Sequence, residues 1–167
     1  MAILNIIKDG NPILRKKSKT VYGINSEIKK LINDMIETMY SANGIGLAAN
    51  QVGVLLRIIV IDITPEKTAP IVLINPEIIE KEGKLCEYEG CLSFPGLNLM
   101  IKRARFVKVK GLNDNCKPVE IEAEGLLSRV LQHEIDHLSG IVFIDRIPKK
   151  EKIKLKISGL LNSNKIR

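Results

Sequence analysis

Aromatic residues make up only 4% of this 167-residue sequence, and tryptophan is absent. A hydrophobic core must therefore be built mainly from isoleucine, leucine and valine. The three cysteines are odd in number and unevenly spaced, which argues against a disulfide framework and favours a reducing compartment. Long hydrophobic runs are also missing: the longest, Ile58 to Ile63, is interrupted by Asp62 and is too short to span a membrane.

The N-terminus lacks the series of charged region, apolar stretch and cleavage site that marks a secretory signal. Hydrophobic residues make up 45% of the chain and charged residues 27%, which is typical of a globular protein. We therefore expect a single cytoplasmic domain that covers residues 1–167.

Histidine is the scarcest of the chemically useful residues, and both copies lie in the run His133-Glu134-Ile135-Asp136-His137. Residues four apart share one face of a helix, so two imidazoles at this spacing can reach one metal ion. The neighbouring Glu134 could then act as a general base. Apolar residues at spacings of three and four precede the run, and Gly140 follows as a stop signal. The alternative is a helix with two partly buried histidines and no metal.

A catalytic zinc-like site needs three protein ligands and one open position. Cys91 is the best candidate for the third ligand, because Gly90 and the segment Phe94-Pro95-Gly96 let its backbone approach closely. Cys86 and Cys116 lack such a context, and we expect both to be small buried hydrophobic residues.

A third segment, Gly44-Ile45-Gly46-Leu47-Ala48-Ala49-Asn50-Gln51, follows a predicted helix. Its glycines leave backbone N–H groups accessible, and Gln51 offers a neutral amide that could stabilise an oxyanion. It is not a phosphate loop, because no Gly-Lys-Ser/Thr ends it. Taken alone, this segment is a weak signal.

Together, in this order and spacing, the three segments resemble the signature motifs of the peptide deformylases. Those motifs are G-x-G-x-A-A-x-Q, E-G-C-x-S and H-E-x-x-H, and every fixed position is matched here: Gly44, Gly46, Ala48, Ala49 and Gln51; Glu89, Gly90, Cys91 and Ser93; His133, Glu134 and His137. The resemblance extends over essentially the whole chain. It implies a metal-dependent hydrolase that removes the N-terminal formyl group from formyl-methionyl nascent peptides and releases formate.

The resemblance also implies a role for individual residues. Cys91, His133 and His137 would hold the metal, Glu134 would move the proton of the attacking water, and Gln51 with the backbone N–H of Leu92 would bind the oxyanion. Substrate would contact Ile45, Gly46 and Gly90 as an added strand, and Val130 would be a wall of an apolar pocket. Glu89 and Ser93 would hold the cysteine loop.

The resemblance makes Fe²⁺ the expected metal, one ion per chain, although the ligand set also suits Zn²⁺, Ni²⁺ or Co²⁺. The expected partner is the formyl-Met nascent peptide. We expect the protein to be a monomer that contacts no membrane and recognises no specific nucleic acid sequence. The net charge is +7, with a local excess of lysine after Pro148. This basic C-terminus could contact the ribosome, or its charge could serve only solubility.

The remaining pattern predicts an α+β fold, in which antiparallel or mixed sheets wrap around a central helix carrying the histidines. A helix is expected over residues 25–40, capped by Asn25 or Ser26, and a short one after Pro148 with apolar positions Ile153, Leu155, Ile157, Leu160 and Leu161. Strands are expected over Leu55–Ile63, Ile71–Ile74, Phe106–Lys110 and Val119–Ala123, with a hairpin of Glu77–Glu82 and Leu85–Tyr88 around Gly83.

Two other classes of function remain open at this point. A zincin-type metallopeptidase also uses H-E-x-x-H, but no suitable third ligand follows at the usual downstream spacing. A non-catalytic structural metal protein would close its site with four protein ligands, and only three good candidates are present. A deformylase relative without activity would be expected to have damaged motifs.

Overall fold

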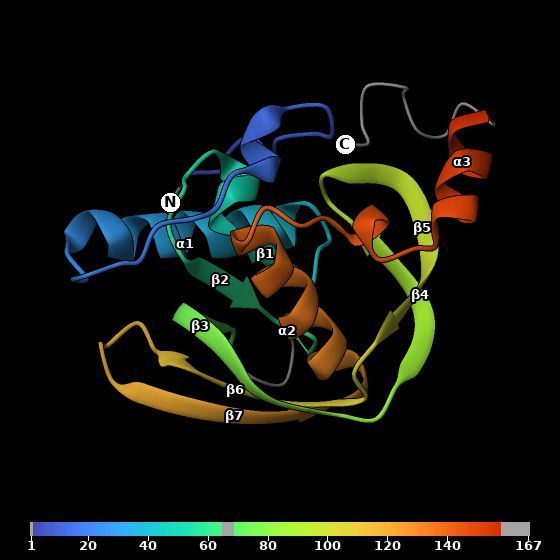
Figure 1. Ribbon diagram of the computed structural model, residues 1–167. Coiled ribbons are helices and arrows are strands. Elements are labelled where there is room, and N and C mark those ends of the chain that lie inside the picture. Colours follow the sequence, from blue (N-terminus) through green and yellow to red (C-terminus); the bar gives the residue numbers. More distant parts are fainter. Residues whose placement is uncertain (1, 65–68, 158–167) are drawn as a thin grey trace.

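The computed structural model of the chain describes residues 2–64 and 69–157, and it has an α+β architecture (Figure 1). Helix α2 (Gly125–Leu138) lies in the middle of the described part, with sheets curving around it. Helix α1 (Ser26–Ser41) and the short α3 (Lys149–Ile157) lie outside these sheets. This arrangement confirms the predicted fold class.

Two antiparallel sheets supply the walls. The five-stranded sheet has the order β1-β2-β3-β6-β7, and the second sheet is the pair β4-β5. The strands are β1 (Gly46–Ala48), β2 (Ile58–Ile61), β3 (Ile71–Glu82), β4 (Leu85–Cys91), β5 (Phe94–Arg103), β6 (Phe106–Leu112) and β7 (Pro118–Glu124). Three single turns of 3₁₀ helix, η1 (Pro12–Arg15), η2 (Ala49–Val52) and η3 (Phe143–Asp145), complete the described elements.

Strand β2 shows why the sequence has an unbroken run of branched apolar residues at 58–61. Ile58 and Val60 pack with residues of α1 such as Met35 and Met39. Ile59 and Ile61 point to the opposite face, where they join Leu131 of α2 in a second cluster. Because helices cover both faces of this strand, every one of its side chains is buried.

Helix α1 begins as predicted, since the Asn25 side chain accepts a hydrogen bond from Ile28 N. Helix α2 ends shortly before Gly140, which has a φ of +73°. An alanine Cβ at Gly140 would lie 2.4 Å from the Arg15 carbonyl oxygen, so glycine permits both the turn and the close approach. The C-terminal end of the histidine helix therefore lies where the sequence places a glycine.

The expected hairpin around Gly83 is wrong. Strand β3 pairs with β6, so that Glu82 lies opposite Phe106, whereas β4 pairs with β5, so that Leu85 lies opposite Arg103. Gly83, with a φ of +62°, carries the chain from one sheet to the other. Neighbouring strands in the sequence are separated here because both find partners further along the chain.

Several strand boundaries also differ from the predictions. Strand β2 is shorter than Leu55–Ile63, and β3 continues through Asn75-Pro76, where the chain had been expected to leave the strand. The pairing shifts register between Ile74 and Glu77, and Asn75 has a φ of +54°. A bulge therefore lets the strand continue past a proline. Strands β6 and β7 confirm the two predicted there, each slightly longer.

Two strands were not predicted at all, β1 within the glycine-rich segment and β5 after the cysteine motif. The expectation that Cys86 and Cys116 are buried is also wrong, because both are exposed. Cys86 lies on the outer face of β4, and Cys116 lies in the turn before β7 with a φ of +61°.

The expected helix after Pro148 is confirmed as α3, which packs through Leu155 onto a cluster around Phe143 and Ile144. Leu160 and Leu161, also assigned to this helix by the pattern, lie outside the described residues. Within residues 2–64 and 69–157, no helix has the length and apolar character needed to cross a membrane.

Candidate active site

Three potential metal ligands converge between the two sheets. Cys91 lies at the end of β4, and His133 and His137 lie one turn apart on α2. One donor atom from each lies within 4.8 Å of the other two. Cys91 Sγ is 3.3 Å from His137 Nε2, and the two imidazole centroids are 5.0 Å apart. One thiolate with two imidazoles is a donor set that suits a divalent transition metal.

The cysteine reaches this position because β4 and β5 are joined by a very tight turn. Cys91 pairs directly with Phe94, so that only Leu92 and Ser93 lie between the strands. The N-terminal segment holds this turn: Lys8 Nζ donates to the Leu92 carbonyl oxygen at 2.9 Å, and Asp9 N donates to that of Ser93 at 2.8 Å.

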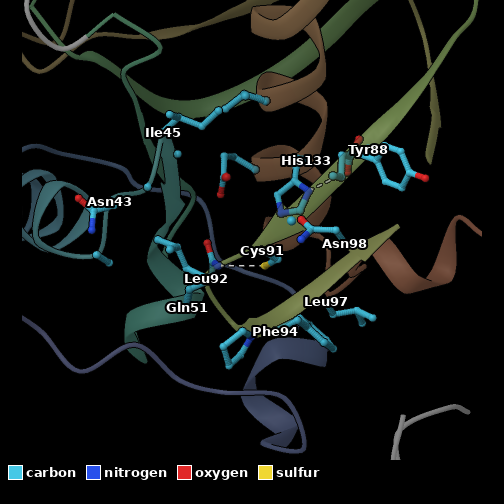
Figure 2. Close-up of a pocket in the computed structure, with 18 of the residues that line it drawn as sticks. Asn43, Ile45, Gln51, Tyr88, Cys91, Leu92, Phe94, Leu97, Asn98 and His133 are labelled. Atoms are coloured by element: carbon cyan, nitrogen blue, oxygen red, sulfur yellow. Dashed lines mark hydrogen bonds and ion pairs between the residues drawn. The ribbon is translucent and has the colours of Figure 1, made fainter. Parts of the chain in front are cut away.

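The hydrogen-bond partners of the Gln51 amide oxygen and amide nitrogen define the orientation of this side chain. Its Oε1 accepts a hydrogen bond from Ala48 N at 2.9 Å, so the amide nitrogen must point the other way. Nε2 lies 3.1 Å from Ser93 Oγ. It also lies 3.5 Å from Cys91 Sγ (Figure 2). The side chain is 1% exposed. A buried donor is thereby aimed at the sulfur end of the site.

Glu134 is a buried carboxyl group beside the histidines. Burial raises its pKa to about 7, and its Oε2 has no hydrogen-bond partner among the described residues. A Cβ at Gly46 would lie 2.6 Å from Glu134 Oε1 and 2.8 Å from Val130 Cγ1. Glycine in β1 therefore makes room for this carboxyl group. A pKa near neutrality is what a general base requires.

The two imidazoles differ in their surroundings. Burial works to lower the pKa of His133, but hydrogen bonds with Cys91 and Glu89 outweigh it and raise the pKa well above its ordinary value. Burial and the neighbouring charge of His133 lower the pKa of His137 well below its ordinary value. His133 Nδ1 lies 3.0 Å from Glu89 Oε2, which leaves its Nε2 as the nitrogen free to bind a metal.

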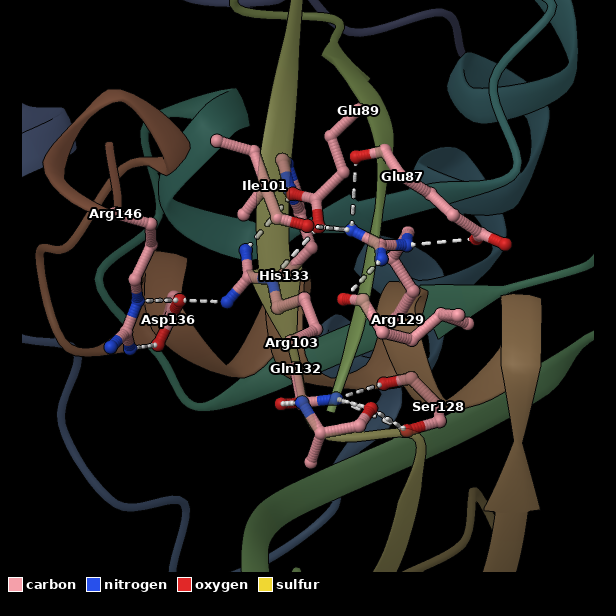
Figure 3. A network of polar contacts seen from close by, with 12 residues as sticks. Glu87, Glu89, Ile101, Arg103, Ser128, Arg129, Gln132, His133, Asp136 and Arg146 are labelled. Carbon is pink, nitrogen blue, oxygen red and sulfur yellow. Dashed lines mark hydrogen bonds and ion pairs between the residues drawn. The ribbon is translucent and has the colours of Figure 1, made fainter. Parts of the chain in front are cut away.

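Behind His133 lies a network of buried ion pairs (Figure 3). Arg103 donates to both oxygens of Glu89, at 2.8 and 3.0 Å, and also to Asp136, which accepts further bonds from Arg146. Burial would raise the pKa of Glu89, but hydrogen bonds from His133 and Arg103 lower it to about 2. Glu89 is therefore a carboxylate across the physiological pH range.

A cavity of about 520 Å³ opens in front of these groups. Among its lining residues are nine of the ten predicted site residues: Ile45, Gly46, Gln51, Gly90, Cys91, Leu92, Val130, His133 and Glu134. The tenth, His137, is fully buried behind them. Tyr88 and Leu97 also line the cavity (Figure 2), and Tyr88 is 72% exposed.

A sequence model of the family described as polypeptide deformylase matches residues 3–153. The chain belongs to this family. A peptide deformylase of Thermodesulfovibrio yellowstonii is 56% identical over 156 residues, covering 92% of this chain and 94% of that protein. One from Aquifex aeolicus is 51% identical over 148 residues, covering 87% and 88%.

Solved structures of deformylases agree in fold. The crystal structure of a peptide deformylase from Legionella pneumophila has a TM-score of 0.89 at 45% identity, covering 93% of this chain and 92% of that one. One from Synechococcus elongatus, in complex with actinonin, has a TM-score of 0.92 at 40% identity, covering 100% and 93%. The chain is accordingly an enzyme, a metal-dependent deformylase, and the zincin-type and structural-site alternatives have no support.

Sequence reasoning missed the charged groups behind the deformylase site. Arg129 precedes His133 by one helical turn, and this spacing was the signal that could have indicated a shared partner. Arg103 lies on the inner face of β5, a strand that was not predicted. Glu89 and Ser93, expected to support the cysteine loop, contact His133 and Gln51 respectively.

Proposed function

We propose that Cys91, His133 and His137 hold one divalent metal ion for the hydrolysis of N-terminal formyl groups. The observation that carries this proposal is the convergence of three donor atoms within 4.8 Å, beside a buried Glu134 whose pKa is about 7. When bound, the cation would lower the pKa of a water molecule and so supply the nucleophile. The family resemblance favours Fe²⁺; Zn²⁺, Ni²⁺ and Co²⁺ suit the same ligands.

Glu134 moves the proton in this proposal. Its carboxylate takes a proton from the attacking water and returns it to the amine that leaves. Burial raises the pKa of Glu134 in the metal-free chain, and a bound cation would favour the carboxylate form that accepts the proton. Its unpartnered Oε2 leaves one oxygen available for this transfer.

Gln51 and the backbone N–H of Leu92 stabilise the oxyanion that develops on the formyl oxygen. The Ala48 N–H fixes the Gln51 amide beforehand, so the donor needs little reorganisation as charge appears. Both residues line the cavity next to Cys91. Removing one such donor typically costs about 2.7–4 kcal/mol of transition-state stabilisation.

The substrate of this proposal is a formyl-methionyl nascent peptide in extended form. Strand β1 is at the edge of the five-stranded sheet, so Ile45 and Gly46 can pair with a peptide backbone on the cavity side. Gly90 faces the same cavity from β4, and Val130 adds an apolar wall for the methionine side chain.

We further propose a cytoplasmic monomer whose basic C-terminus contacts the ribosome. Support comes from α3, which carries Lys149, Lys150, Lys152 and Lys154 within two helical turns. Deletion of residues after Pro148 should reduce co-sedimentation with ribosomes at low salt while leaving hydrolysis of a short formyl peptide intact. Unchanged co-sedimentation would reject the contact.

Metal content measured on matched cysteine variants tests the site. The purified protein is loaded with Co²⁺ without oxygen, and the bound metal and the sulfur-to-cobalt absorption band are measured. We expect Cys91→Ala to lose both, whereas Cys86→Ala, an exposed cysteine in the same strand, should retain both. A Cys91→Ala protein that keeps the metal and the band would overturn the ligand assignment.

A further inference from the structure

Arg129 is a buried arginine on α2, one helical turn before His133. It is 3% exposed, and its guanidinium reaches the same carboxylate as the imidazole of His133 (Figure 3). Arg129 Nη1 donates to Glu89 Oε1 at 2.6 Å, and His133 Nδ1 lies 3.0 Å from Glu89 Oε2. Two residues four apart on one helix thus share Glu89 from β4.

With Arg129 in place, every acceptor position of Glu89 is used. Oε1 accepts from Arg103 Nε at 2.8 Å and from Arg129 Nη1, while Oε2 accepts from Arg103 Nη2 at 3.0 Å and contacts His133. A carboxylate has about four acceptor sites, so these four contacts occupy all of them. Its side chain is held in one orientation.

Arg129 also ties the second sheet to the helix. Its Nη1 donates to the Ile101 carbonyl oxygen at 2.9 Å, and its Nη2 donates to that of Leu85 at 3.1 Å. Glu87 Oε2 lies 3.4 Å from its Nε. The contacts come from both β4 and β5, and Glu89 is only two residues before Cys91. Arg129 therefore contacts β4, the strand that carries Cys91, and itself lies on α2, the helix that carries His133 and His137.

We propose that Arg129 is a positioning residue for the metal site and acts through Glu89. It fixes the carboxylate that occupies His133 Nδ1, and so keeps Nε2 directed at Cys91 and His137. The proposal rests on the metal-binding role given above to these three residues. Groups that orient a metal ligand in this way typically contribute about 10–100-fold to metal affinity.

The contacts to Leu85 and Ile101 raise a competing explanation, in which Arg129 only holds the sheets together. The two explanations predict different metal affinities when Arg129 is replaced in a protein that already carries Glu89→Gln. If Arg129 acts through Glu89, its loss should have no further effect on metal affinity in a Glu89→Gln protein. If Arg129 acts only by holding the sheets together, the fold-losses in metal affinity of the two single variants should multiply in the double variant.

The experiment measures the dissociation constant for Co²⁺ by competition with a chelator, together with the cobalt absorption spectrum. The proteins are the parent, Arg129→Met, Arg129→Lys, Glu89→Gln, and the double variant Arg129→Met/Glu89→Gln. Arg105→Met is the matched control, because Arg105 is exposed and its only ion pair in the described residues is a 3.8 Å contact with Glu124. Urea unfolding of each metal-free protein shows which variants are folded.

We expect Arg129→Met to weaken Co²⁺ binding about 10–100-fold and to change the spectrum. Arg129→Lys should recover part of the affinity, since an ammonium group can still donate to Glu89, and the double variant should match Glu89→Gln. Arg129→Met affinity within twofold of the parent, or multiplying losses in the double variant, would overturn the proposal. If Arg129→Met does not fold, Arg129→Lys combined with Glu89→Gln makes the same comparison.

The same data separate this inference from the proposed function. A parent protein that binds Co²⁺ without the sulfur band contradicts the ligand assignment itself, whatever Arg129 does. A parent with a normal site and an Arg129 series without effect contradicts only the positioning role.

Discussion

Replacing Glu134 by glutamine should stabilise the metal-free protein while removing most of its activity when metal is bound. The reason is that Glu134 is 4% exposed and that its Oε2 has no hydrogen-bond partner among the described residues. Ionisation of this carboxyl group in the folded protein is costly, and burial therefore raises its pKa. Glutamine has a similar shape but carries no charge.

The size of the effect follows from the two pKa values. In the folded protein the pKa is about 7, against an ordinary value of 4.5 in the unfolded chain. Each pKa unit corresponds to about 1.4 kcal/mol, so the full penalty is about 3 kcal/mol. It is absent below pH 4.5, where both states are protonated, grows as the pH rises, and is complete above pH 7, where both states are ionised.

Urea unfolding of chelator-treated protein, followed by far-ultraviolet circular dichroism, measures this difference. The stability of Glu134→Gln minus that of the parent should rise by about 3 kcal/mol between pH 4.5 and pH 8. The buried glutamine amide has a cost of its own, but this cost does not change with pH. Glu124→Gln, which alters an exposed side chain, should show no comparable rise.

A stability difference that stays constant from pH 4.5 to pH 8 would refute this reasoning about Glu134. Loading with a divalent metal should shrink the difference, because a nearby positive charge favours the ionised carboxylate. Loss of a general base lowers turnover by about 10²–10⁴-fold, so formate release by metal-loaded Glu134→Gln should fall within that range. Full activity in this variant would rule out the proton-transfer role.

Three further changes probe other parts of the structure. Gln51→Ala should lower kcat by about 10²–10³-fold with bound metal unchanged, and an unchanged kcat at full metal content would reject the oxyanion role. Gly46→Ala should reduce activity, since its Cβ would meet the Glu134 carboxyl and Val130, and steady-state kinetics equal to the parent's would show that the helix can move away. Leu131→Ala removes a fully buried side chain beneath the site and should cost about 2–5 kcal/mol in urea unfolding, whereas a loss below 1 kcal/mol would mean that the core repacks.

The histidine helix was predictable because its information is local. Apolar spacing, the H-E-x-x-H run and Gly140 all lie within a few turns, and α2 follows them closely. The same holds for α1, whose cap and periodicity are both visible in the sequence. Cys91 and Gln51 could be singled out because each lies in a recognisable motif, even though the strands that place them were not all foreseen.

The sheet pairing was not predictable from local sequence. Around Gly83 the adjacent segments look like a hairpin, yet each pairs instead with a strand further along the chain. Strand β5 begins with turn-forming residues, so the sequence there predicts a turn. The inward-facing Leu97, Leu99 and Ile101 alternate with exposed residues further along the same strand. Which strands pair depends on competition between whole strands, so it cannot be predicted from any single residue.

The buried charges were missed for a related reason. Arginine is seldom buried without a partner, and nothing in the sequence around Arg103 and Arg129 indicates that both are buried. Their partners, Glu89 and Asp136, become neighbours only after β5 has folded against α2. The motif carried Glu89 as a fixed position, but its role as the shared anchor of an imidazole and two guanidinium groups is visible only in three dimensions.

Formate release tests the central claim most directly. Protein purified without oxygen, with its metal content measured, is given a formyl-Met tripeptide and, in parallel, the acetyl-Met form. We predict rapid formate release from the formyl peptide, no hydrolysis of the acetyl peptide, and activity proportional to metal up to about one ion per chain. No formate release from a folded chain with iron or nickel bound would contradict the assignment of this site as a metal-dependent deformylase centre.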